Sequence, residues 1–318
     1  MKVPKEVGIL ALLLVLCAFV SVMNPRFLGP ENLQNTARLI GLYGIFSLGV
    51  GVVIITSGIE LSIGSTFALM GVLLAMMLTE RHLHPVVAVG AVLALTTAIG
   101  AWHGFLITRL KMQPFIVTLC GLLFYRGIAR FVARDETKGF GTSEGFEGLR
   151  DAATGSVYGV PTPFVILLVV AALMWVLVHR SVYGRHLMAV GRNEEASRYS
   201  GLNTRRIIAT AYVICGLLTG VAGVLIAFYT NSVSPSTHGN FYELYGIAAS
   251  VLGGCSLRGG EGSVTGVLLG AALLQVLQNL VNLLGIPSSL NYAVMGAVIL
   301  LGVMADQLLR DRKRTPAV

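Results

Sequence analysis

The chain has 318 residues, of which 55% are hydrophobic and only 12% are charged, and its mean hydropathy is +0.78. Soluble domains carry about 25% charged residues, so this composition excludes a soluble protein. Apolar runs of about 20 residues indicate membrane-spanning helices and exclude a membrane barrel, which shows short alternating segments. The net charge of +8 does not indicate nucleic-acid binding, because the basic residues lie between and beside the apolar runs, where membrane topology requires them.

Apolar segments suited to crossing a membrane follow one another along the chain. Nine of them come close to the length that a bilayer requires, and they lie at about 7–23, 40–57, 61–79, 85–108, 114–133, 161–179, 207–229, 263–284 and 290–309. A tenth segment, 243–256, is shorter than a standard crossing. We expect an all-α, polytopic membrane bundle of about ten transmembrane segments, some broken or short, which forms a single domain over residues 1–318.

The distribution of basic residues predicts which connections face the cytoplasm. With an even number of spans both termini lie on one side, and placing them in the cytoplasm puts 15 of the 23 Lys and Arg residues there. The opposite side holds fewer basic residues, and acidic side chains dilute them. Because cytoplasmic connections carry an excess of Lys and Arg, we expect both termini in the cytoplasm.

The first interruption of the apolar pattern lies at 55–65, with the sequence ITSGIELSIGS. It places serines, glycines and a carboxylate between two apolar runs that are too close together for a comfortable loop. Helices broken in this way occur in transporters, where the freed backbone groups line a cavity. Ser57, Glu60 and Ser62 are therefore candidates for a translocation path. The alternative is a tight cytoplasmic turn with a solvated Glu60.

A polar, arginine-rich connection occupies residues 180–206 and holds six of the 23 basic residues. Its charge predicts a cytoplasmic position. Within it, we expect Asn193 to cap a short helix, Glu194 and Glu195 to occupy the first turn, and Gly201 to end it. A capped, charged helix that a membrane protein presents to the cytoplasm indicates a docking site for a partner.

A second interruption begins at 242–246, with the sequence YELYG, and leads into the glycine-rich run 253–262. Each interruption contains a Glu-Leu pair, at Glu60 and at Glu243, one in each half of the chain. Spans 2–5 and 7–10 would then be inverted repeats on either side of an unpaired sixth span, which is a known transporter arrangement. Glu243 is a further candidate for the translocation path.

Four carboxamide side chains share one face of the predicted helix 263–284. Gln275, Gln278, Asn279 and Asn282 stand at i, i+3, i+4 and i+7. Carboxamides both donate and accept hydrogen bonds without charge, which suits hydroxyl-rich neutral solutes. The face therefore predicts a path for a neutral sugar. The alternative is that these side chains join neighbouring helices, a role that Asn and Gln also fill in membranes.

No motif in the sequence indicates catalysis or metal binding. The glycine-rich run lacks the lysine of a Walker A loop, because none of the five lysines follows a glycine. The H-E-x-x-H pattern is missing as well, and the G-x-S-x-G pattern occurs only at 141–145, in a predicted loop and not at the strand-to-helix turn of a nucleophile elbow. We expect no catalytic residue, no metal site and no cofactor bound by this chain. Any use of ATP must then occur on a partner.

Four segments together resemble the sugar-type permease subunits of ATP-binding-cassette (ABC) importers, the ribose permease group. They are ITSGIELSIGS at 55–65, KMQPFIVTL at 111–119, AVGRNEEASRYSGLN at 189–203, and ELYGIAASVL at 243–252 with the Gly-Gly turn that follows. They occur in the family's order, and the resemblance runs from about Pro25 to Met304. Two departures are mild: many relatives carry Asp where this chain has Glu60, and Ser197 replaces the second alanine of a signature described next.

Glu195-Ala196-Ser197, with Gly201 four residues later, is similar to the EAA signature that docks a permease on its ATPase. Glu194 lies beside it. The resemblance implies a permease subunit in the plasma (inner) membrane that forms the path for a monosaccharide, ribose-like or another neutral sugar. It also implies a second permease chain, an ATPase that carries ATP and magnesium, and an extracytoplasmic sugar-binding protein.

Three other functions remain open at the sequence level. A permease of the same superfamily for branched-chain amino acids or nucleosides is the nearest one, although an α-amino acid should require a charged clamp that the neutral carboxamide face lacks. An ion-coupled secondary transporter would require ionisable residues deep inside spans, and few of these occur. A membrane-embedded enzyme is disfavoured because no catalytic constellation is present.

Overall fold

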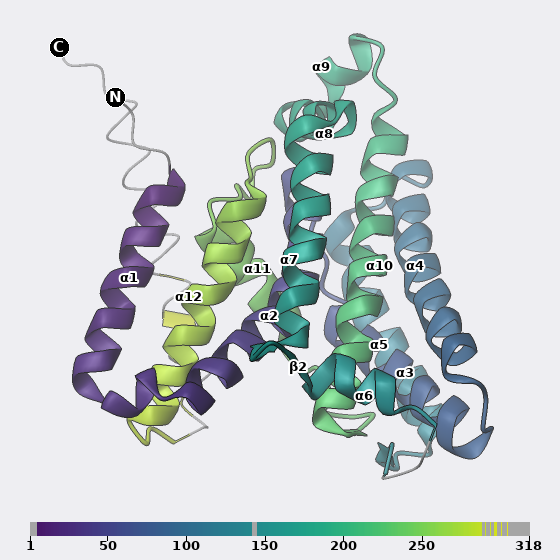
Figure 1. Cartoon of the computed structure of the whole chain (residues 1–318). Coiled ribbons are helices and arrows are strands. Elements are labelled where there is room, and N and C mark those ends of the chain that lie inside the picture. The colour runs from purple at the N-terminus through teal and green to yellow at the C-terminus, as the bar shows by residue number, and fades with distance from the viewer. Residues whose placement is uncertain are drawn as a thin grey trace, which may run out of the picture.

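The computed structural model describes residues 5–141 and 145–287, together with isolated positions from 290 to 304. These parts of the chain are almost entirely helical (Figure 1). The helices are α1 (Lys5–Met23), α2 (Pro30–Ile55), α3 (Ile63–Ala75), α4 (Pro85–Arg109), α5 (Pro114–Ala133), α6 (Glu147–Thr154), α7 (Thr162–Trp175), α8 (Val182–Arg192), α9 (Glu194–Tyr199), α10 (Thr204–Thr230), α11 (Tyr242–Leu252) and α12 (Val264–Leu283).

Short elements extend or join these helices. A 3-10 turn, Pro25–Leu28, links α1 to α2, and π-helical turns continue α3 over Met76–Glu80 and α7 over Val176–Arg180. Four two-residue strands form two antiparallel ribbons, in which β1 (Lys138–Gly139) pairs with β4 (Ser232–Val233) and β2 (Ser156–Val157) pairs with β3 (Val160–Pro161). The β1–β4 pair joins the connection after α5 to the connection after α10.

Eight helices among the described residues are long and apolar enough to cross a membrane, and they confirm the first eight full-length segments that the sequence predicts. The predicted start of the second span, at residue 40, was too late, because α2 already begins at Pro30 and carries polar residues in its first turns. The short segment predicted at 243–256 is the eleven-residue helix α11. At 1.5 Å per residue it spans about 16 Å, roughly half of a bilayer core. The ninth full-length prediction, 290–309, lies outside the continuous described residues.

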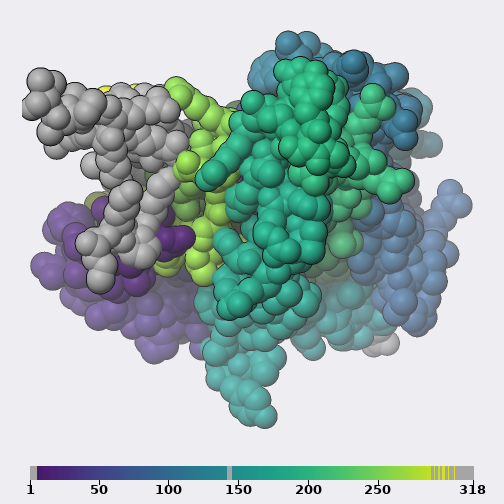
Figure 2. All heavy atoms as spheres, turned by 90° about the horizontal axis from the view of Figure 1, so that it is seen from above, coloured from purple at the N-terminus to yellow at the C-terminus, as the bar shows by residue number. Residues whose placement is uncertain are grey.

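Helices α2 and α10 form the centre of the bundle. In both, 78% of the apolar window is buried inside the protein, against 6% in α1 and 22% in α4. Seen from above, α1 (purple) lies at one margin and α4 (blue) at the other, with the segments from α8 to α10 (teal to green) between them (Figure 2). The outer helices therefore present their apolar side chains to lipid, and the interior is built from α2 and α10 with α3 and α11 against them.

Helices α4 and α10 cross at glycines that stand four residues apart in each helix. A Cβ on Gly104 would lie 2.8 Å from the Cα of Ala209, and a Cβ on Gly220 would overlap the hydroxyl oxygen of Thr96. Gly100 and Gly216 face backbone oxygens of the opposite helix just as closely. Lipid provides no hydrophobic drive for helix association, so close packing of small residues is what holds such helices together in a membrane. The antiparallel pair fixes the interior of the bundle around α10.

The connections gather at two ends of the bundle. Figure 1 shows α8 and α9 beyond the ends of α7 and α10, and we name this the α9 end. The loop 253–263 also lies there, since the N–H of Gly260 bonds to the carbonyl of Ile55, next to Gly191 of α8. Helix α6 and the two ribbons lie at the opposite end.

Candidate functional site

The predicted docking helix exists and ends at the bundle surface. Asn193 caps α9 with its side-chain oxygen, which accepts a hydrogen bond of 2.8 Å from the N–H of Ala196. Glu194 and Glu195 occupy the first turn, where carboxylates are favoured by the helix dipole. Gly201 takes a left-handed conformation, φ 84°, two residues after the helix ends. The structure thus confirms the cap, the acidic first turn and the stop predicted from the sequence.

The five predicted docking residues differ in their exposure to solvent. Glu195, Ala196 and Gly201 are exposed, while Ser197 is buried against the rest of the chain. Glu194 is exposed as well, but its carboxylate accepts a hydrogen bond of 3.1 Å from the hydroxyl of Thr204, at the start of α10. Helix α9 is therefore fastened to α10 on one side and offers Glu195 and Ala196 to the surroundings on the other.

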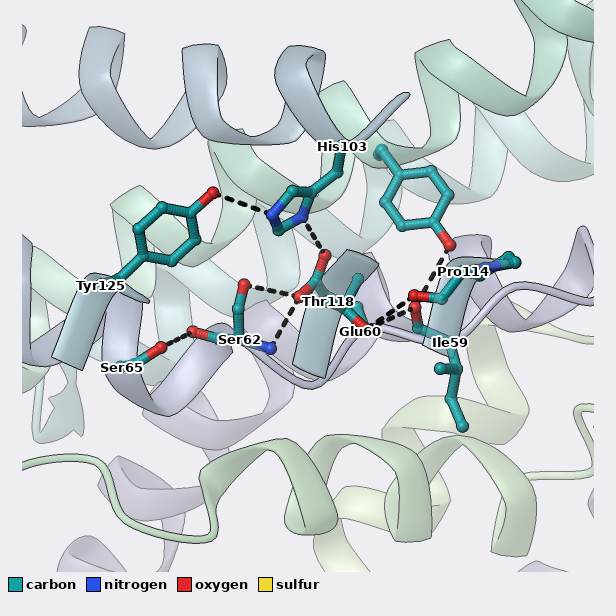
Figure 3. Close-up of polar contacts among 9 residues, drawn as sticks. Ile59, Glu60, Ser62, Ser65, His103, Pro114, Thr118 and Tyr125 are labelled. Atoms are coloured by element: carbon teal, nitrogen blue, oxygen red, sulfur yellow. Dashed lines mark hydrogen bonds and ion pairs between the residues drawn. The ribbon is translucent and has the colours of Figure 1, made fainter. Parts of the chain in front are cut away.

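The first interruption is an unwound segment, 56–62, between α2 and α3, and Glu60 lies buried within it (Figure 3). One carboxylate oxygen of Glu60 accepts hydrogen bonds from the N–H of Ser62 (2.8 Å) and from its hydroxyl (2.7 Å). The other lies 2.8 Å from Nδ1 of His103 on α4, and Nε2 of His103 lies 2.9 Å from the hydroxyl of Tyr125 on α5. Glu60 is 5% exposed and His103 is 1% exposed, so the alternative of a solvated turn is excluded.

The backbone of the same segment is satisfied by side chains from other helices. The carbonyl of Ile59 accepts hydrogen bonds from the hydroxyl of Tyr212 on α10 (3.2 Å) and from that of Thr118 on α5 (3.4 Å). Non-helical backbone is tolerated at membrane depth only where it is buried in protein or lines a cavity. The broken helix is thus held inside the bundle by α4, α5 and α10.

Sequence reasoning missed His103 and Tyr125. His103 is a lone histidine in the predicted span 85–108, and an ionisable residue inside a span is a signal by itself. Its partner could not be identified from the sequence, because Glu60 is 43 residues away and nothing in the spacing brings them together. The helix crossing creates the pair.

The second interruption lies just before the stretch that the sequence predicts. Residues 242–246 already belong to α11, so their prediction as a break was wrong, and the unwound segment is 231–241. Arg126 of α5 holds this segment, because its Nη1 donates hydrogen bonds to the carbonyls of Pro235 (3.2 Å) and His238 (2.8 Å). A half-buried arginine that binds carbonyls stabilises backbone groups that a helix would otherwise pair.

The two interruptions meet inside the bundle. Glu243 is buried in the first turn of α11, and a Cβ on Gly64, in the first turn of α3, would lie 2.7 Å from its carboxylate oxygen. Helices α3 and α11 thus begin beside one another. They run in opposite directions, because α3 leads to Glu80, which pairs with Lys138 at 3.1 Å, whereas α11 leads to the loop 253–263 at the α9 end. These directions are compatible with inverted repeats.

The four carboxamides of α12 have different surroundings. Asn279 forms two hydrogen bonds with the side-chain amide of Asn32 on α2, at 2.7 and 3.2 Å. Gln278 donates to the hydroxyl of Tyr245 on α11 at 3.3 Å. Gln275 is 3% exposed, and its Oε1 has no partner among the described residues, while Asn282 is exposed. Two of the four side chains therefore join helices, and the other two retain hydrogen-bonding capacity.

Comparison with known proteins identifies the family. A model of the branched-chain amino acid transport system / permease component family matches residues 32–303. The chain belongs to this family. The permease is 40% identical to the ribose import permease protein of Escherichia coli (strain K12) over 294 residues, which are 92% of the chain and 91% of the relative.

Further relatives of the permease cover it as fully. It is 36% identical to the ribose import permease protein of Bacillus subtilis (strain 168) over 96% of the chain and 94% of the relative. It is 33% identical to the L-arabinose ABC transporter permease protein of Azospirillum brasilense over 96% and 89%. The comparison with solved structures found no match.

Proposed function

We propose that this permease is the membrane subunit of an ABC importer and forms the translocation path for a monosaccharide, ribose-like or another neutral sugar. The observation that carries the proposal is the 40% identity, over nearly the whole chain, to a ribose import permease. Permeases for arabinose and xylose match over 96% of the chain as well. A transport permease is not an enzyme, so the energy for import comes from a separate subunit.

We further propose that an ATPase subunit docks on α9 through Glu194, Glu195, Ala196 and Gly201, while the buried Ser197 packs the helix against the rest of the chain. The exposed carboxylate of Glu195 and the cap at Asn193 support this assignment, because they present a rigid, charged helix end beyond the spans. ATP and magnesium are bound by the ATPase, and this chain binds no cofactor. The docking surface then lies in the cytoplasm, which also places both termini there.

The rest of the complex follows from the same proposal. A second permease chain, identical or homologous, completes the path, and an extracytoplasmic sugar-binding protein delivers the sugar to the end that carries α6. Residues 1–318 act as one permease domain. The path takes its polar groups from the first interruption, from the start of α11 and from α12, namely Ser57, Glu60, Ser62, Glu243, Gln275 and Asn282, while Gln278 and Asn279 join α12 to neighbouring helices.

Reconstitution tests this function. The permease, with its proposed ATPase and binding-protein partners, is placed in proteoliposomes and supplied with radiolabelled ribose, arabinose, xylose or leucine. We expect ATP-dependent accumulation of at least one sugar, and none of it with Glu195→Lys, which reverses the charge of the docking helix. Glu147→Lys, an exposed glutamate in the first turn of α6 at the opposite end, is the matched control and should co-purify with the ATPase as the wild type does.

The family description names branched-chain amino acids, so leucine is the informative competitor. Uptake of leucine without uptake of any sugar would replace the proposed substrate class and leave the importer architecture standing. Uptake driven by a proton gradient by the purified chain alone would remove the ABC importer proposal itself.

A further inference from the structure

Ser57 lies where three segments distant in sequence meet at the α9 end. It follows α2 directly and takes a left-handed backbone conformation, φ 63°. Its hydroxyl lies 3.1 Å from the carbonyl oxygen of Gly191, near the end of α8, and 2.9 Å from that of Arg258, in the loop between α11 and α12. The single hydroxyl proton is shared between two carbonyls that belong to different parts of the chain.

The backbones around this hydroxyl are in direct contact. The N–H of Gly260 donates a hydrogen bond of 2.8 Å to the carbonyl of Ile55, the last residue of α2. A Cβ on Gly191 would overlap that same carbonyl, and a Cβ on Gly259 would overlap the hydroxyl of Ser57. The backbones of these segments approach so closely that neither Gly191 nor Gly259 has room for a side chain. We name Ile55, Ser57, Gly191, Arg258 and Gly260 the Ser57 junction.

The junction connects the docking helix to the first interruption and to the loop that follows α11. On one side Gly191 is two residues from Asn193, which caps α9. On another, Ser57 begins the unwound segment that contains Glu60 and leads into α3. On the third, Arg258 and Gly260 lie in the loop that joins α11 to α12. Close-packed contacts of this kind transmit displacements, because packed elements shift as units.

We propose that the Ser57 junction passes movement of α9 to α3 and to α11. Ser57 is then a positioning residue for the coupling of ATP hydrolysis to transport. The inference rests on the proposed function, since α9 can transmit movement only if an ATPase binds it. Without the hydroxyl, α8 and the loop 253–263 lose their common donor, while the exposed face of α9 is unchanged. The ATPase should then dock and hydrolyse ATP, but less sugar should be transported for each ATP hydrolysed.

The experiment compares Ser57→Ala and Ser57→Gly in the reconstituted complex with ribose as the probe. Both variants remove the hydroxyl, and Ser57→Gly also relieves the left-handed backbone, so it should melt at or above the wild-type temperature. We expect the ribose accumulated per ATP hydrolysed to fall at least about fivefold in both, as a coupling between sites typically requires. The amount of ATPase that co-purifies should not change.

Thr108→Ala is the matched control, because that hydroxyl lies near the α9 end of α4 and, among the described residues, bonds only to the carbonyl of Gly104 in its own helix, at 2.7 Å. Its ribose-to-ATP ratio should equal that of the wild type. A fault in the path itself would slow transport and hydrolysis together and leave this ratio unchanged. The ratio therefore distinguishes a residue that couples hydrolysis to transport from a residue that lines the path.

Two outcomes overturn the inference in different ways. If the wild-type complex transports ribose and the Ser57→Gly complex keeps the wild-type ratio, the junction does not couple, and the proposed function stands. If the wild-type complex neither binds the ATPase nor transports any sugar, the proposed function fails and this inference fails with it.

Discussion

At the scale of single residues, the most informative group is the buried chain Glu60–His103–Tyr125. Its three side chains come from an unwound segment, from α4 and from α5, and their polar atoms are 2.8 and 2.9 Å apart. A buried polar group without a partner costs far more than a paired one contributes. These three side chains therefore fix the position of the first interruption relative to α4 and α5, and they do so without any substrate bound.

We expect Glu60→Gln and His103→Gln each to lower the free energy of unfolding, and the double variant to be less destabilised than the sum. The coupling energy should be about 1–3 kcal/mol, because the two side chains are in contact inside the bundle. Unfolding in mixed detergent micelles measures it. Asp135→Asn, which removes an exposed partner of Arg130, is the control and should cause no measurable change. An additive cycle would show that Glu60 and His103 do not stabilise one another.

The α12 carboxamides allow a second prediction at this scale. We expect Gln275→Leu to slow sugar uptake per assembled complex roughly tenfold, since a lost hydrogen bond of ~1.4 kcal/mol in the transition state is one decade in rate. Asn279→Leu should instead lower the melting temperature, and Asn32→Leu should restore it in part, because the double variant leaves neither amide of the half-buried pair without its partner. The recovery is incomplete because Asn32 also donates a hydrogen bond of 2.9 Å to the carbonyl of Phe27. Normal uptake by Gln275→Leu complexes would remove Gln275 from the path.

At the scale of elements, the glycine-lined crossing of α4 and α10 decides how the interior is assembled. The predicted spans 85–108 and 207–229 are both confirmed, but their contact was not predicted, although each contains two glycines four residues apart. Such spacing is common in membrane helices and does not indicate which pair of helices meets. The partner of His103 could not be predicted either, because only the packing of the unwound segment 56–62 against α4 brings Glu60 to it.

Replacing a crossing glycine tests this contact. Gly104→Ala would bring a Cβ to 2.8 Å from the Cα of Ala209, so we expect a loss of about 1–3 kcal/mol of unfolding free energy from overpacking. Gly90→Ala in the same helix has open space around its Cβ. It should be neutral or stabilising, because alanine is the better helix former. Equal effects of the two substitutions would contradict a close crossing at Gly104.

At the scale of the whole molecule, hydropathy, charge and local motifs predicted the helices, but the sequence did not predict the tertiary contacts between them. The eight long spans and the helix from Glu194 to Tyr199 follow from hydropathy and capping residues, which act over a few residues. The second interruption was misplaced by several residues, because the sequence signal of Glu243 and its glycines marks the start of α11, and the unwound segment is held by Arg126 from another helix. Contacts of that kind leave no local signature.

The orientation of the whole molecule is the last prediction, and it follows from charge. The connections at the α9 end carry most of the basic residues of the described chain, and such connections remain in the cytoplasm. We expect Gly148→Cys, exposed on α6, to react with a membrane-impermeant maleimide in intact cells, in a background without the four native cysteines. Ser200→Cys, exposed beside α9, should react only after permeabilisation. Ser200 is chosen because Ser197 is buried. Labelling of both positions in intact cells would overturn the assignment of the two ends and, with it, the cytoplasmic docking of an ATPase on α9.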